Sequence, residues 1–183
     1  MMMECGKMGL TYENLDEATR AQMLEELRHD VERSGVYLSG RLTDNGKNEW
    51  VELLREAATS GTDDSLATRL RERGFVRQEE QRKKPSGGST TAKVPHTAPD
   101  TLAEGEFNRL YARALCRRAI AEGCGLEVYR GKEAKNPRSE SEAKIGTAVD
   151  PEALLADLRK SVGVEPALGL PSGPNSGLTV RLR

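Results

Sequence analysis

The sequence has few aromatic residues and no long apolar run. Phe, Trp and Tyr make up 4% of the 183 residues, whereas charged residues make up 31%. A chain of this length can bury a real core, but we expect that core to be lean. No apolar stretch approaches the roughly 20 residues of a membrane-spanning helix, and the start, MMMECGKMGL, lacks the apolar segment of a signal peptide. The sequence therefore predicts a cytoplasmic protein with no membrane partner.

The chain also lacks paired cysteines and a large net charge. Cys5, Cys116 and Cys124 do not have the spacing of a zinc site or a redox motif, so we expect buried or idle thiols. His29 and His96 have no serine, cysteine or metal-ligand partner nearby in the sequence. We therefore expect no metal and no cofactor. The formal net charge of −1 argues against a nucleic-acid-binding protein held by electrostatics alone.

The longest helical apolar pattern lies between Glu104 and Glu122. Its apolar residues fall on one face at helical spacing: Phe107, Leu110, Tyr111, Ala114 and Leu115. Gly123 supplies a stop and a left-handed C-cap. We expect this helix to be the centre of the fold, with its apolar face buried.

A cationic pattern occupies another face of the same helix. Arg109, Arg113 and Arg117 recur every fourth position, away from the apolar face. Such a stripe can grip phosphates, which makes these three arginines the candidate binding residues of the chain. The alternative interpretation is a solvated face with local ion pairs, such as one between Glu106 and Arg109.

Three shorter helices are predicted before the central one, each with an Asp or Thr start and a glycine after its end. They cover Ala18–Arg33, the stretch from Thr43 or Asp44 to Gly61, and the stretch from Thr62 to Gly74. The short turn between the second and third allows a helix-turn-helix interpretation, with Arg69, Arg71 and Arg73 on the recognition helix. Against it, Asp63 and Asp64 would meet DNA phosphates at the start of that helix.

The composition changes between Gln78 and Pro99, which reads QEEQRKKPSGGSTTAKVPHTAP and has no apolar period. This composition predicts a flexible linker or arm. Its basic cluster, Arg82-Lys83-Lys84, is a candidate contact for nucleic acid or for an acidic partner. The alternative is that the charges only keep the linker solvated.

Two strands and one helix are predicted after the central helix. Leu126–Tyr129 and Leu178–Leu182 have strand character, and Asp150-Pro151-Glu152 is a strong helix start. The predicted fold class is thus α+β, with the central amphipathic helix packed on a small sheet. We divide the chain into a helical unit over residues 10–75, a linker or arm over 76–100, and an α+β domain over 101–183 with a tail rich in proline and glycine.

Two partial enzyme patterns occur. Pro99-Asp100 with Glu133-Ala134-Lys135 has the residue types of a PD-(D/E)xK nuclease, whose carboxylates hold Mg²⁺. Ser89-Thr90-Thr91 with Glu140-Ser141-Glu142 is similar to the serine motif and ExE element of ADP-ribosyltransferases, which implies Glu142 as the catalytic carboxylate. We adopt neither pattern, because Asp100 directly precedes a helix, Glu133 falls in a charged loop, and no strand is evident around Ser89.

The sequence contains no glycine-rich phosphate loop after a strand and no assembled catalytic motif. We therefore predict a non-catalytic interaction or assembly protein, a subunit of a larger phage or bacterial complex with other protein subunits as partners. The alternative hypothesis is a nucleic-acid-binding accessory or a nucleic-acid-processing enzyme.

Overall fold

The computed structural model describes residues 9–164, 166–170 and 176–183. These residues form an α+β fold with six helices and two small antiparallel sheets. The helices are α1 (Glu17–Glu32), α2 (Asp44–Ser60), α3 (Asp63–Glu72), α4 (Ala98–Glu122), α5 (Ser139–Lys144) and α6 (Pro151–Lys160). The strands are β1 (Glu79–Lys83), β2 (Ser89–Lys93), β3 (Leu126–Arg130), β4 (Ala148–Val149) and β5 (Leu178–Leu182).

The long helix α4 is the centre of the fold, as predicted. Phe107, Tyr111 and Leu115 are fully buried, and Leu110 is nearly so. The helix begins six residues before the predicted Glu104, because a proline is tolerated in the first helical turn, where its missing N–H has no partner to lose. It ends at Gly123, whose φ of 68° is left-handed and therefore suits glycine.

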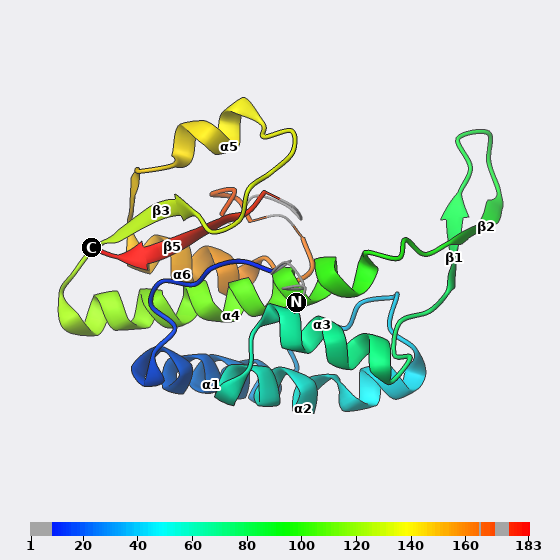
Figure 1. The fold of residues 1–183 in the computed structure, drawn as a ribbon, viewed down its shortest axis with the longest axis horizontal. Helices are drawn as coiled ribbons and strands as arrows, with labels where there is room; N and C mark the ends of the chain where they lie inside the picture. Colours follow the sequence, from blue (N-terminus) through cyan, green and yellow to red (C-terminus); the bar gives the residue numbers. More distant parts are fainter. Residues whose placement is uncertain (1–8, 165, 171–175) are drawn as a thin grey trace, which may run out of the picture.

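Helix α4 lies between two layers (Figure 1). Helices α1 and α3 pack on one side, and α6 with the β3–β5 sheet packs on the other. The buried residues of all these elements form one cluster that runs from Met23 in α1 through Leu115 in α4 to Val180 in β5. The helical unit of residues 10–75 and the α+β part of residues 101–183 thus share one hydrophobic core.

The sheet beside α4 has the strand order β4-β3-β5, with both pairs antiparallel. Leu126 pairs with Leu182 and Val128 with Val180, so apolar residues of neighbouring strands share the face that is buried. Both predicted strands are confirmed. The polar connection between β3 and α6 also contains α5, which has a polar sequence, and β4, which is only two residues long, so neither carries an apolar period.

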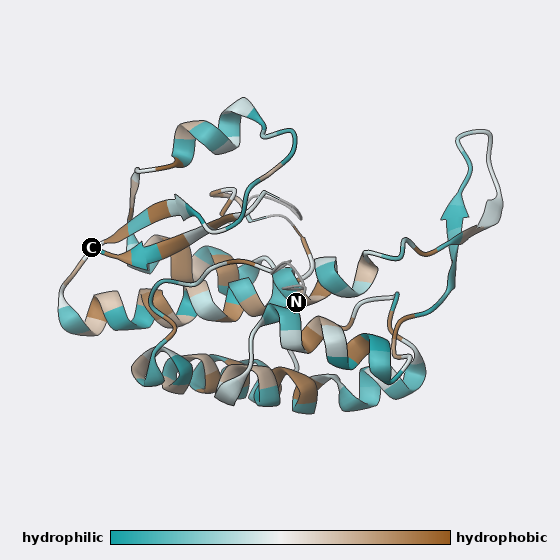
Figure 2. Ribbon diagram, in the orientation of Figure 1, coloured by the Kyte–Doolittle hydropathy of each residue, from teal (hydrophilic) through white to brown (hydrophobic). Residues whose placement is uncertain are grey.

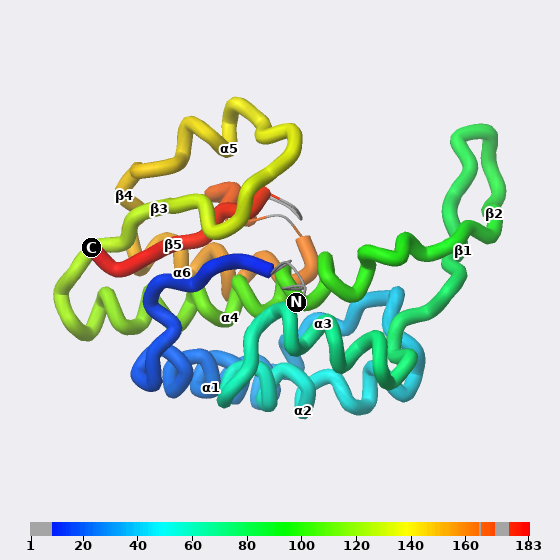
Figure 3. Tube along the Cα trace, viewed as in Figure 1, coloured from blue at the N-terminus to red at the C-terminus, as the bar shows by residue number. Residues whose placement is uncertain are grey.

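The segment predicted as a linker or arm forms a β-hairpin that stands away from the body (Figure 3). Its register pairs Glu79 with Lys93 at the base and Lys83 with Ser89 near the tip. Gly87 and Gly88 have φ angles of 94° and 78°, which let the chain reverse there. Hydrophilic residues run along the ribbon (Figure 2), so periodicity could not reveal its strands.

Within the described part of the chain, no helix is long and apolar enough to cross a membrane. The proline- and glycine-rich tail lies partly outside the described residues, at 171–175, and the described remainder ends in β5.

Candidate functional site

Two of the three arginines predicted as a cationic stripe form ion pairs with α1. Arg113 is 2% exposed; its Nε donates to Glu26 at 2.7 Å, and its terminal nitrogens donate to Asp30 at 2.7 and 2.8 Å. Arg117 also donates to Glu26, at 3.2 Å. The alternative of a solvated face is therefore wrong for Arg113. Phosphate binding by Arg109, Arg113 and Arg117 stays a prediction.

Glu26 is the anion at the centre of this buried cluster. It is fully buried and also accepts hydrogen bonds from Arg159 of α6, at 2.5 and 3.2 Å. Burial alone would raise the pKa of Glu26, but the hydrogen bond from Arg159 and the charge of Arg113 outweigh it and lower the pKa to about 2. The ionised carboxylate consequently ties α1 to both α4 and α6.

Arg109 occupies a different position, beside an open groove. One terminal nitrogen donates to the carbonyl of Leu158, while its buried Nε has no hydrogen-bond partner. The expected ion pair between Glu106 and Arg109 is not formed in the described residues. Of the three arginines of the predicted stripe, only Arg109 lines the groove.

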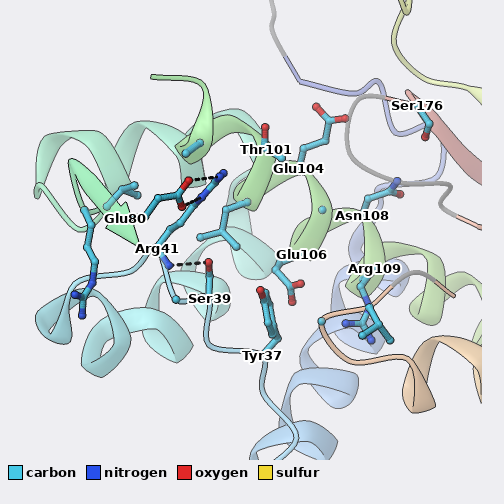
Figure 4. A pocket seen from close by; sticks show the side chains of 18 of the residues that line it. Tyr37, Ser39, Arg41, Glu80, Thr101, Glu104, Glu106, Asn108, Arg109 and Ser176 are labelled. Carbon is cyan, nitrogen blue, oxygen red and sulfur yellow. Dashed lines mark hydrogen bonds and ion pairs between the residues drawn. The ribbon is translucent and has the colours of Figure 1, made fainter. Parts of the chain in front are cut away.

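The groove has a volume of about 1060 Å³. The first half of α4 forms one wall, and residues 37–41, the base of the hairpin and the described residues around Gly163 and Gly177 form the others (Figure 4). The ring of Tyr37 lies so close to Gly163 that an added Cβ there would come within 2.6 Å of it. These contacts show that the groove is built from segments far apart in the sequence.

Two carboxylates of α4 lie in this groove and point to opposite sides of the helix (Figure 4). Glu104 accepts a hydrogen bond of 2.8 Å from Lys132. Glu106 points toward Tyr37 and has no hydrogen-bond partner among the described residues. Its removal from water raises its pKa to about 7, against the opposing charge of Arg109. Glu106 can therefore change its protonation near neutral pH.

In the part of the chain that the structure describes, no side chain forms a hydrogen bond with Glu106. In the same part, His, Cys, Asp and Glu residues do not gather into any set of three that could hold a metal ion.

The hairpin is fastened to the rim of the groove at its base. Arg41 donates two hydrogen bonds to Glu80, of 2.8 and 3.0 Å. Hydrogen bonding from Arg41, together with that from Arg82, lowers the pKa of Glu80 to about 2. Beyond this anchor every residue from 81 to 91 is exposed. We call residues 81–91 the distal hairpin.

Neither partial enzyme pattern is brought together. Ser89-Thr90-Thr91 lies on the exposed strand β2, whereas Glu140 and Glu142 lie on α5, at the other side of the molecule in Figure 1. Asp100 lies in the first turn of α4 and is bonded to Arg71, while Glu133 is exposed after β3. In helix α3, two of the three arginines of the helix-turn-helix interpretation are held in ion pairs. Arg69 pairs with Glu56, Arg71 with Asp100, and Leu66 and Leu70 are buried.

The described cysteines fit the expectation of buried or idle thiols. Cys116 is fully buried, and burial raises the pKa of its thiol to about 12, so the reactive thiolate is suppressed. Cys124 is half-buried and free. Cys5 lies outside the described residues.

Sequence reasoning missed the groove and the unpaired Glu106. One signal was present: Glu106, Leu110 and Arg113 follow each other at spacings of four and three, so they share a helix face. A buried Leu110 on that face draws its neighbours toward the interior. The groove itself depends on contacts between distant segments and left no local pattern.

The chain matches no family model, no curated protein and no solved structure at a significant level.

Proposed function

We propose that this protein is a non-catalytic interaction protein that belongs to a larger assembly and contacts its partner through the β1–β2 hairpin. One observation carries the proposal: the distal hairpin is a paired β-ribbon whose residues are all exposed. Ordering a segment costs roughly 1–2 kcal/mol of backbone entropy per residue. A two-stranded hairpin by itself is at best marginally stable in water. A partner that covers the ribbon would supply the missing contacts.

The groove extends this surface at the base of the hairpin. Glu79, Gln81 and Thr91 of the hairpin line the groove together with Thr101 of α4. A partner on the hairpin can therefore continue into the groove without a gap. Both outer edges of the two-stranded ribbon also carry backbone groups that are unpaired in this sheet, and exposed edges of this kind invite a contact.

Site-directed photo-crosslinking in cells that make the full chain tests this proposal. A benzophenone amino acid is placed at position 90 in the hairpin or, as the control, at position 152 on the exposed surface of α6. We expect adducts of higher mass from position 90 and few from position 152. Nuclease or protease treatment of each adduct then tells nucleic acid from protein.

Two results would count against the proposal. Position 90 could give no adduct, or the two positions could give the same adducts in the same amounts. In either case the hairpin would not be a preferred contact surface. Thermal melting of both proteins must match that of the parent, so that a folding defect is not mistaken for lost contact.

The alternative of a nucleic-acid-binding accessory is favoured by a separate observation. The distal hairpin carries the cations Arg82, Lys83 and Lys84 and no acidic residue. The cations of the hairpin therefore support this alternative better than the arginines of α4 do.

A further inference from the structure

We propose that the distal hairpin binds the phosphate backbone of duplex DNA, with the ribbon lying in the major groove. This inference rests on the proposed function, since it names the partner of the same surface. The B-DNA major groove is about 12 Å wide and admits a two-stranded β-ribbon. Phosphates are contacted mostly by Arg, Lys and small polar side chains.

The composition of the distal hairpin matches that chemistry. It has three cations, four hydroxyl side chains at Ser86, Ser89, Thr90 and Thr91, one amide at Gln81, and no acid. Its one apolar side chain is the ring of Pro85. Protein interfaces instead concentrate aromatic residues and Met at their core and are depleted in Lys and Ser. A polyanion is therefore the better match than an apolar protein surface.

Two of the three cations are free to bind. Among the described residues, Lys83 and Lys84 form no ion pair, and both are exposed. Arg82 is held by Glu80, with Nε to Oε1 at 2.9 Å. Lys83 and Lys84 therefore stand near the tip as unneutralised charges, whereas Arg113 in the body is buried against Glu26 and Asp30.

The acidic groups of the body lie too far back to cancel these charges. The nearest of them, Glu80, is at the base of the ribbon, three residues before Lys83 and four before Lys84. At about 3.4 Å per residue these separations are roughly 10 and 14 Å along the strand. Screening at physiological salt acts over about 8 Å. The tip can thus enter a DNA groove while the acidic base stays outside, which reconciles local binding with a net charge of −1.

Fluorescence anisotropy of the full chain with a labelled 20-base-pair duplex tests the inference over a salt series. Neutralisation of two to three phosphates predicts a slope of about −2 to −3 for log K against log salt. Lys83→Gln with Lys84→Gln should reduce that slope by about 2 and weaken low-salt binding at least tenfold. The matched control, Lys135→Gln with Lys160→Gln, removes two exposed lysines elsewhere and should change neither quantity.

Other arms separate the remaining explanations. Double-stranded RNA should bind more weakly, because its A-form major groove is deep and narrow. Equal or tighter binding of RNA or single-stranded DNA would overturn the ribbon-in-groove geometry. Absence of duplex binding at low salt, or equal loss in both variants, would overturn the DNA inference. If protein adducts from position 90 persisted in that case, the proposed interaction function would stand with a protein partner.

Discussion

At the scale of single residues, two glutamates of this protein show how environment sets charge. Glu26 is fully buried but bound by three arginines, so it stays ionised. Glu106 is half-buried without a partner among the described residues, so removal from water favours its neutral form. The consequences for stability have opposite signs. The Glu26 contribution is present above the unfolded pKa and is lost as pH falls toward about 2.

Replacing Glu106 by Gln tests the second case. The pKa of Glu106 rises from 4.5 to about 7 on folding, so the folded state binds the extra proton between these values. The contribution of Glu106 to the stability of the parent then falls as pH rises from about 4.5 to 7. Glu106→Gln abolishes this titration. We expect the melting temperature of the variant, relative to the parent, to increase between pH 5 and pH 8, by about 2–4 °C for each kcal/mol recovered.

Glu49→Gln, at an exposed position of α2, is the control and should follow the parent at both pH values. Parallel pH profiles for Glu106→Gln and the parent would show that the carboxyl group is solvated in the folded protein. Glu106 would then be an ordinary ionised carboxylate of the groove at neutral pH.

At the scale of elements, Arg113 and Arg117 of α4 form a clamp that holds α4 to α1. Arg113 joins α4 to Glu26 and Asp30 of α1, and Arg159 brings α6 to the same carboxylate. Removing one partner of a buried ion pair costs about 3–5 kcal/mol, because the remaining charge stays buried. Arg113→Met should therefore lower the free energy of unfolding by about 3 kcal/mol, measured by urea denaturation at pH 7.

The control for this change is an arginine of the surface. Arg55 pairs with Glu52 one turn away on α2, and both side chains are largely exposed. Exposed pairs contribute roughly 0–1 kcal/mol, so Arg55→Met should have little effect. A loss below about 1 kcal/mol for Arg113→Met as well would mean that the clamp does not hold α1 in place.

The elements that the sequence predicts well are those with a local signal. Asp16, Thr43, Thr62 and Asp150 each accept a hydrogen bond from the first turn of the helix that they were expected to start. The hairpin has no apolar alternation, and its strands follow from a glycine turn and cross-strand pairing. The alternative of a solvated stripe on α4 fails at Arg113, because a helical wheel shows which residues share a face but not what covers it. Acidic residues of α1, more than 80 positions earlier, cover Arg113.

At the scale of the whole molecule, the shared core joins the two halves of the chain. Trp50 lies in α2 and is fully buried, and it belongs to the same cluster as Leu115 of α4. The segment before α1 adds polar contacts, since Asn14 accepts from Leu182 of β5 at 2.9 Å and donates its own N–H to Tyr111 of α4 at 3.2 Å. A core without a break should unfold as one unit.

Leu115→Ala tests this unity, because the chain has one tryptophan and it lies far from position 115 in the sequence. Truncating a fully buried leucine costs roughly 2–5 kcal/mol. We expect urea unfolding followed by Trp50 fluorescence and by far-UV circular dichroism to give one coincident transition in the parent. In Leu115→Ala the transitions followed by the two signals should still coincide, and the free energy of unfolding from each should be lower by that amount. If the fluorescence midpoint stayed in place while the dichroism midpoint fell, the helical unit would be stable without α4, and the two halves would be separate folding units.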